Sequence, residues 1–513
     1  MRGTLTALDL TVVLVYLAVV VGKGGLLAKK QRDLEDYFLA GRKMGFFAVG
    51  ISIIASLLSA ITYLGAPAEA YGHDLRFSLT LLCIPLVTPI VLRVFLPFFY
   101  QLNLYTAYEY LERRFNLAVR TVASVFFMFW RLCWMALVIY APSLALSEFV
   151  DIPWWAAVLI LGVLSTAYTT LGGMRAVIWT DVVQFFVLYG GVLLVGGLTL
   201  VRSGVELGAM WAEALAAGKL QVLDFRLDPT IRVTTPAIFL GWTFGALAAY
   251  ATDQVAIQRY LTTKNFAESR RSLIFHALVI VPVSIVFYWV GSLLWAFYHH
   301  RPELLSGFDE SRPDRILPFF IVQQLPLGLK GILIAALFAA TMSSIDSGIN
   351  SVTTATIVDF YQGLLRRRST SGQQLALARV WTVLWGGIAT WLAIAAGVWG
   401  QTLVEMSNKT AGLFMGPLLG IFLLGMLTRR ATGGGALLGA TVGFALVLYV
   451  AFRTPLTFLY YPAIGCLTTL ALGYELSLLF PPPRREQILG LTLNYDRWGN
   501  RLRKRRPRPS PTA

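Results

Sequence analysis

The stretch GFFAVGISIIASLLSAITYLGAPAEAY (45–71) decides the fold. It is apolar over enough residues to cross a membrane, and Gly65 and Pro67 follow its middle. That middle carries four hydroxyl side chains, those of Ser52, Ser56, Ser59 and Thr62. An interrupted helix is tolerated at membrane depth only where protein, water or an ion satisfies the freed backbone groups. The stretch therefore predicts a broken transmembrane helix beside a binding site.

Two other apolar stretches depart from a plain membrane helix. TPAIFLGWTFGALAAYATDQVAIQRY (235–260) has Gly241 and Gly245 in its middle. GILIAALFAATMSSIDSGINSVTTATIVDFY (331–361) is rich in hydroxyls and holds an acid among them. The first stretch and 235–260 begin about 190 residues apart. This separation is typical of the broken first helices of two repeated halves, with a site between them.

The composition is that of a membrane protein. Of 513 residues, 57% are hydrophobic and only 14% are charged, whereas a soluble domain carries about a quarter charged residues. Apolar runs of about 20 residues recur throughout, each long enough to cross the hydrocarbon core. We therefore predict an all-α polytopic membrane protein of about 13 transmembrane helices. They lie near 7–28, 46–70, 77–100, 119–147, 153–171, 177–201, 235–259, 273–299, 328–360, 375–398, 408–427, 433–452 and 456–480.

The basic residues behind the net charge of +16 indicate how the chain is oriented in the membrane, and they do not indicate nucleic-acid binding. The basic residues form short clusters between apolar runs, without a continuous basic face. Every second connection is richer in Lys and Arg, and such connections stay in the cytoplasm. The N-terminus is then outside and the C-terminus cytoplasmic, in a plasma membrane or a bacterial inner membrane. The tail from Pro481, rich in Pro and Arg, is interpreted as disordered.

The strongest candidate site lies in the stretch 331–361. Sodium is a hard cation that takes oxygen ligands, and hydroxyls at 343, 344 and 347 lie at neighbouring helical positions. Asp346 adds a carboxylate, which is costly inside a membrane unless it is paired or hydrated. The alternative is that the serines hydrogen-bond back to their own helix or join helices together. The cluster favours an ion site.

Two further charges lie within apolar runs. Asp181 follows Arg175 closely, so the cytoplasmic interface is an alternative environment for its carboxylate. Arg131 either meets an anionic substrate or pairs with an intramembrane acid such as Asp181 or Asp346. Enzyme signatures such as HExxH, a P-loop or GxSxG are absent from the sequence, which predicts that the chain is not an enzyme.

Six segments resemble the sodium:solute symporter family. They are LSAITYLGAPAEAY (58–71), TAYEYLERRFN (106–116), YAPSLALS (140–147), YTTLGGMRAVIWTDVVQ (168–184), DQVAIQRYL (253–261) and SSIDSGINS (343–351). Within the family they look most like the monocarboxylate, multivitamin and iodide branch, and they are also similar to bacterial sialic acid transporters. The resemblance implies a five-plus-five inverted-repeat core at 46–430, with broken first and sixth core helices. An extra helix and loop (1–45) would precede the core, and two helices (431–480) and the basic tail (481–513) would follow it.

The resemblance also implies site residues. The main sodium site would use carbonyls of Ala55, Leu58 and Ala340 with hydroxyls of Ser343 and Ser344. A second sodium site would use Asp181, Ser343, Asp346 and Ser347, and this chain departs from its relatives in having a carboxylate at 346. The extra carboxylate would either tighten binding of the second ion or take a proton in its place. The substrate site would use Ser59, Thr62, Phe77, Arg131 and Trp242.

These residues imply a sodium-coupled symporter that imports a small organic solute, with a carboxylate or another anion as the favoured class. The co-transported ions would be one or two Na⁺, with no organic cofactor. We expect the protein to function as a monomer in the lipid bilayer, with sodium and a small-molecule substrate as partners. A sodium-coupled sugar or polyol symporter is one alternative. A membrane sensor that binds without transporting is another.

Overall fold

The computed structural model describes residues 6–28, 33–102, 104–150, 152–326, 328–365, 370–396 and 403–493. Most of these residues are helical and none forms a named strand, which confirms the all-α prediction. Eight of the described helices are long and apolar enough to cross a membrane, and a bent pair adds a ninth. Shorter apolar helices occupy Ala7–Val20, Trp154–Ala167 and Thr235–Ala251. The polytopic fold is thus confirmed, and the count of 13 spans stays a prediction.

The first half of the chain forms α1 (Ala7–Ala28), α2 (Leu34–Leu39), α3 (Phe46–Leu57), α4 (Ala60–Gly72), α5 (Cys83–Ile90), α6 (Leu96–Leu102), α7 (Glu109–Arg114), α8 (Leu117–Val150), α9 (Trp154–Ser203) and α10 (Leu207–Ala216). The second half forms α11 (Thr235–Ala237), α12 (Thr243–Ala251), α13 (Gln254–Leu261), α14 (Phe266–His300), α15 (Ile316–Gln324), α16 (Leu329–Ala355), α17 (Ser371–Ala396), α18 (Leu403–Leu427), α19 (Gly433–Arg453), α20 (Tyr461–Ser477) and α21 (Arg485–Ile488).

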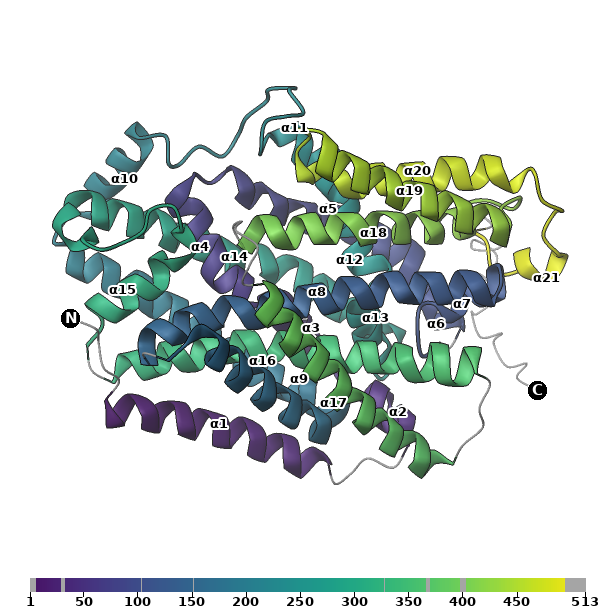
Figure 1. Ribbon diagram of the computed structural model, residues 1–513, viewed down its shortest axis with the longest axis horizontal. Helices are drawn as coiled ribbons and strands as arrows, with labels where there is room; N and C mark the ends of the chain where they lie inside the picture. Colours follow the sequence, from purple (N-terminus) through teal and green to yellow (C-terminus); the bar gives the residue numbers. More distant parts are fainter. Residues whose placement is uncertain are drawn as a thin grey trace, which may run out of the picture.

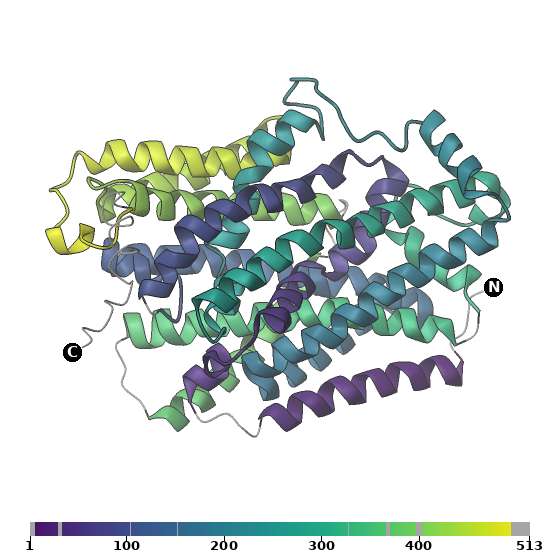
Figure 2. The ribbon, with the colours of Figure 1, turned by 180° about the vertical axis from the view of Figure 1, so that it is seen from behind.

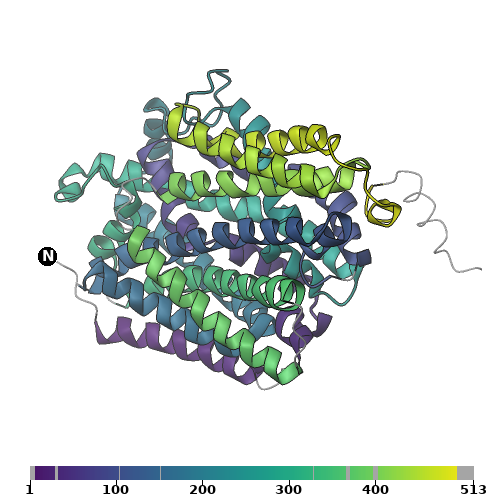
Figure 3. The same ribbon diagram turned by 45° about the vertical axis from the view of Figure 1, so that its right-hand side comes forward.

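The long helices run roughly side by side along one axis of the molecule (Figure 1). Helix α16 lies in the middle and packs against α1, α3, α8 and α9, and 94% of its membrane segment is buried. Helix α1 lies on one flank and α19 with α20 on the opposite flank (Figure 3). The start of α1, α10 and α15 lie at one end of the bundle and α2 and α21 at the other, in both opposed views (Figures 1 and 2). The polar stretch of α16 is therefore held at the centre of the molecule.

The predicted break in the first stretch is present. Helices α3 and α4 meet at a bend of 58°. Leu58 leaves the helical conformation with ψ 69°, and the Ser59 hydroxyl accepts a hydrogen bond of 3.2 Å from the Ile61 N–H. Serine is a preferred residue at a helix N-cap, because its side chain satisfies an N–H that the new helix leaves unpaired. The hydroxyl-rich sequence thus starts a second helix in the middle of the span.

The break in the second stretch lies away from its glycines, which corrects the prediction. The helix from Thr235 widens into a π-helical turn at Ile238–Trp242, continues as α12, and is interrupted at Thr252 and Asp253 before α13. A Cβ at Gly241 would lie 2.5 Å from the Leu459 carbonyl oxygen, and one at Gly245 would lie 3.2 Å from the ring of Pro462. These glycines therefore allow close packing against the segment that leads into α20.

Part of the tail is ordered, so its interpretation as disordered from Pro481 is wrong for residues 481–493. The Leu493 N–H donates to the Met426 carbonyl at 2.8 Å, and the Tyr110 hydroxyl donates to the Leu491 carbonyl at 3.1 Å. Basic residues at 29–32 and 366–369 and the tail from 494 lie outside the described residues.

Candidate functional site

A cavity of about 260 Å³ lies between α4, α8, α12, α14 and α18. All five predicted substrate residues line it, namely Ser59, Thr62, Phe77, Arg131 and Trp242. The structure thus brings together residues from four separate segments of the chain. Most of the other lining side chains are apolar, so the cavity suits a small solute with a limited number of polar groups.

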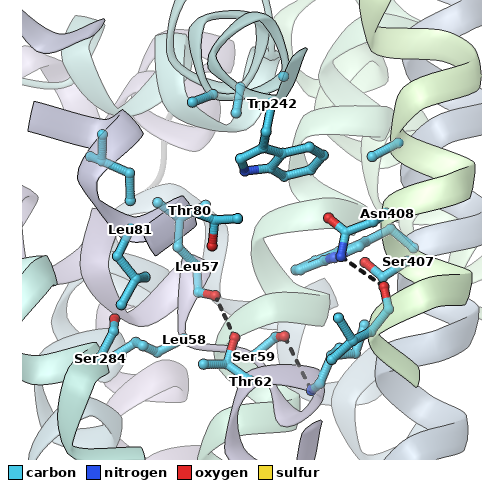
Figure 4. A pocket seen from close by; sticks show the side chains of 18 of the residues that line it. Leu57, Leu58, Ser59, Thr62, Thr80, Leu81, Trp242, Ser284, Ser407 and Asn408 are labelled. Atoms are coloured by element: carbon cyan, nitrogen blue, oxygen red, sulfur yellow. Dashed lines mark hydrogen bonds between the residues drawn. The ribbon is translucent and has the colours of Figure 1, made fainter. Parts of the chain in front are cut away.

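The hydroxyl side chains of the cavity are mostly bonded to the chain itself (Figure 4). The Thr62 hydroxyl donates to the Leu57 carbonyl at 3.3 Å, and the Thr80 hydroxyl donates to the Phe77 carbonyl at 2.7 Å. Asn408 lies across the cavity from Thr62 and donates to the Val404 carbonyl at 2.7 Å. The α18 residues Ser407 and Asn408 were missed by the sequence reasoning, which had no motif to point to that helix.

Arg131 lines the cavity as half of a buried ion pair. Its partner is Asp253, at the break between α12 and α13, so the predicted alternative of a pairing with an intramembrane acid is present, but the acid is neither Asp181 nor Asp346. Arg131 Nε donates to Asp253 Oδ1 at 3.2 Å, and Nη2 donates to Asp253 Oδ2. The guanidinium also lies 4.9 Å from the ring centre of Trp134, within the range of a cation–π contact. The pair is possible because the helix breaks beside α8.

The predicted main sodium ligands come together where the end of α3 faces α16. The Ser343 hydroxyl lies 3.2 Å from the Ala55 carbonyl oxygen and 3.3 Å from that of Ala340. The Ser344 hydroxyl lies 3.4 Å from the carbonyl oxygen of Ser56, and Leu58 is the residue at the break itself. Buried hydroxyl and carbonyl oxygens from two helices form the donor set that sodium prefers. The residues present therefore fit a sodium ion.

The predicted second sodium site contains a residue that the sequence reasoning did not assign. Asp181 Oδ2 accepts hydrogen bonds from the Ser52 hydroxyl at 2.5 Å and from Arg259 Nη2 at 3.0 Å. The same Nη2 donates to the Ser347 hydroxyl at 2.5 Å, so a guanidinium already contacts two of the predicted ligands. Arg259 belongs to DQVAIQRYL (253–261), one of the segments that carry the family resemblance, and this was the available signal.

Asp346 lies beside this cluster with one oxygen satisfied. Its Oδ1 accepts a hydrogen bond of 2.6 Å from the Thr169 hydroxyl of α9. Its Oδ2, and likewise Asp181 Oδ1, is buried without a hydrogen-bond partner among the described residues. A buried carboxylate oxygen without a donor is costly, so each of these two atoms calls for a cation or a proton nearby.

A network of ion pairs lies at the end of the bundle that holds α10 and α15. Arg232, in the connection before α11, donates to Glu69 at 2.6 and 2.9 Å and to Glu405 at 2.7 Å. Glu69 is on α4 and Glu405 on α18, two helices that line the cavity. Nearby Asp314 accepts from the Leu403 N–H at 3.3 Å, and loss of hydration raises the pKa of Asp314 to about 6. The long connection thus joins two walls of the cavity.

Comparison with known proteins adds independent evidence for the class of protein. A model of the sodium:solute symporter family matches residues 37–443. The chain belongs to the sodium:solute symporter family. It is 35% identical to the sodium/sialic acid symporter NanT of Aliivibrio fischeri over 91% of this chain and 92% of that protein. It is 33% identical to human sodium-coupled monocarboxylate transporter 1 over 82% of this chain and 68% of that protein.

The fold of this symporter also matches a solved structure. A Na⁺-coupled sialic acid symporter in a substrate-bound outward-open state superposes with a TM-score of 0.86 at 31% identity, covering 94% of this chain and 99% of that one. Membership and fold together establish a multi-pass membrane protein that uses sodium for solute symport. The recognised relatives are transporters.

Proposed function

We propose that this symporter uses the sodium gradient to import a small organic anion, with carboxylates as the main class. The observation that carries the proposal is the place of Arg131, the only basic side chain among the described residues that line the cavity. A guanidinium presents planar donors that match a carboxylate. Sialic acid and monocarboxylates, the solutes in the names of similar symporters, carry this group. Substrate would contact Ser59, Thr62, Phe77 and Trp242 beside Arg131.

The main sodium ion would bind between the broken helix and α16. Carbonyls of Ala55, Leu58 and Ala340 and hydroxyls of Ser343 and Ser344 would hold it. Sodium would join the two helices and favour the conformation that accepts substrate, because a ligand shifts an equilibrium towards the state it binds better. We propose an external N-terminus, a cytoplasmic C-terminus and a working monomer.

A second cation would bind at the unpaired oxygens of Asp181 and Asp346. The cluster holds two carboxylates and the single guanidinium of Arg259, which leaves one negative charge when both acids are ionised. Nearby charges of the same sign repel strongly at low dielectric, so one more cation stabilises the cluster. With a second sodium, the Hill coefficient of sodium-dependent uptake should exceed one and should fall towards one in Asp346→Ala.

Uptake by proteoliposomes tests the proposed substrate class. Purified protein would be given labelled acetate, lactate, benzoate and glucose, with an inward sodium gradient or with potassium in its place. We expect sodium-dependent uptake of at least one carboxylate. Sodium-dependent uptake of glucose alone would support the sugar-transport alternative and overturn the proposal.

Arg131→Lys separates substrate recognition from sodium binding. Lysine keeps the positive charge and loses the planar pair of donors, so the substrate concentration for half-maximal uptake should rise about tenfold. The sodium concentration for half-maximal uptake should change little. An unchanged substrate affinity in a folded, sodium-responsive variant would assign Arg131 a structural role only.

A further inference from the structure

The ion pair in the cavity wall is electrically neutral. Arg131 and Asp253 are 5% and 1% exposed, and they are the only charged side chains among the described residues that line the cavity. An anion that enters therefore finds donors but no net positive charge in the wall. What balances its charge must come from elsewhere.

The hydrogen bonds of the pair occupy the acceptor sites of Asp253 and leave donors of Arg131 available. Asp253 Oδ1 accepts from Arg131 Nε at 3.2 Å and from the Val255 N–H at 2.9 Å. Its Oδ2 accepts from Arg131 Nη2 and from Trp130 Nε1 at 3.2 Å. A carboxylate has about four lone-pair sites, so that of Asp253 is saturated. Arg131 has five N–H donors, and its Nη1 has no hydrogen-bond partner among the described residues. The pair can receive an anion but not an ammonium group.

The proposed sodium site supplies the missing charge. Leu58, whose carbonyl we place among the sodium ligands, lines the same cavity as Arg131, and so does Ser59 after it. Opposite charges attract strongly in such a poorly hydrated region. Sodium at Leu58 would therefore favour an anion in the cavity more than Arg131 alone can.

We infer that Asp253 makes anion binding depend on sodium. By neutralising Arg131 it prevents the arginine from holding an anion in the absence of sodium, and by its two hydrogen bonds it holds Nε and Nη2, which leaves Nη1 as the donor for an anion. Asp253 is thus a positioning residue that acts through Arg131. This inference rests on the proposed function, because it assumes an anionic substrate.

Asp253→Asn in the full-length protein tests the inference. Asparagine keeps the size of the side chain and can still cap α13 at the Val255 N–H, but it leaves the cavity with a net positive charge. Binding of the carboxylate that wild type transports best, among acetate, lactate and benzoate, would be measured with and without sodium. Coupling free energies commonly correspond to about 5–150-fold changes in affinity, and we expect wild type to bind at least about tenfold more weakly without sodium. The variant should bind the anion nearly as tightly without sodium as with it, so most of the difference seen in wild type should disappear.

Two variants serve as controls. Asp359→Asn alters another buried aspartate paired with an arginine, Arg120, away from the cavity, and should keep the wild-type sodium dependence. The double variant Arg131→Gln/Asp253→Asn is again neutral and should regain sodium dependence at lower affinity. Asp253→Asn that folds and keeps the full sodium dependence of wild type would overturn the inference.

A comparison in wild type decides the question if Asp253→Asn does not fold. Sodium should strengthen binding of benzoate and leave binding of its neutral counterpart benzamide nearly unchanged, or likewise for lactate with lactamide or acetate with acetamide. An equal effect of sodium on acid and amide would overturn the inference. If wild type transports none of the three carboxylates, the proposed function itself fails.

Discussion

Ser343 and Ser344 are adjacent, yet their hydroxyls have different surroundings. Ser343 Oγ lies near two carbonyls that we assign to sodium, at 3.2 and 3.3 Å, whereas Ser344 Oγ lies 3.4 Å from the Ser56 carbonyl. The shorter contacts place Ser343 at the centre of the oxygen cluster. We therefore expect the two hydroxyls to contribute unequally to sodium binding.

Ser343→Ala should raise the sodium concentration for half-maximal uptake by about tenfold, because a hydrogen bond or ligand contact to a charged group contributes about 1.5–3 kcal/mol. Ser344→Ala should raise it less. Thr341→Val on the same helix is the control, since its hydroxyl donates to the Leu337 carbonyl of α16 itself at 2.7 Å. Wild-type sodium dependence in both serine variants would place the ion elsewhere.

At the residue scale, motifs predicted the lining of the cavity but not the partner of Arg131. Ser59 and Thr62 lie in a segment that carries the resemblance, Phe77, Arg131 and Trp242 were assigned to the substrate site by the same resemblance, and all five line the cavity. Asp253 is 122 positions from Arg131, and it reaches the arginine only because the chain breaks between α12 and α13. Local sequence does not encode such a distant pairing.

The two broken spans differ in what the sequence reveals at the scale of elements. Around Leu58 the cap is local, so Ser59 and the hydroxyls before it indicate the break directly. In the span from Thr235, the two glycines led to a helix break being predicted at the wrong residues. Gly241 and Gly245 contact the segment around α20, and such tertiary packing cannot be predicted from the hydrophobic periodicity of the sequence.

Gly241→Ala should destabilise the fold by about 1–3 kcal/mol, because a Cβ 2.5 Å from the Leu459 carbonyl oxygen forces two backbones apart. Thermal unfolding in detergent would report this as a lower Tm. Gly197→Ala in α9 is the matched control, since a Cβ there would meet nothing within 4 Å. Equal Tm values for Gly241→Ala and wild type would contradict the packing of the turn Ile238–Trp242 against η8 (Phe458–Tyr460) and α20.

For the whole molecule, the alternation of basic connections and the apolar runs predicted a polytopic bundle, because hydropathy and length alone select such spans. The network around Arg232 was not predictable, since Glu69 and Glu405 lie 163 and 173 positions away. It ties together helices on either side of the cavity. Contact between these helices at this end of the bundle therefore depends on charge as well as on packing.

Stability in the acidic range should reflect Asp314. Its pKa is raised by loss of hydration to about 6, above that of an ordinary aspartate, so the folded state prefers the protonated acid. This contribution to stability is present below about pH 4 and is lost as pH rises through 6. Tm measured from pH 4 to 7 should therefore decline less in Asp314→Asn than in wild type. Glu69, Glu405 and Arg232 face the same region. An identical decline in both proteins would show that Asp314 is not the source of the pH effect.

The steady-state accumulation of a labelled carboxylate in proteoliposomes, measured at zero voltage over a series of sodium gradients, tests the central claim most directly. With sodium at both proposed sites, the ratio of inside to outside carboxylate should rise as the square of the imposed sodium ratio, and with a single sodium it would rise linearly. A ratio that stays at one whatever the sodium gradient would contradict sodium-coupled anion transport by this protein.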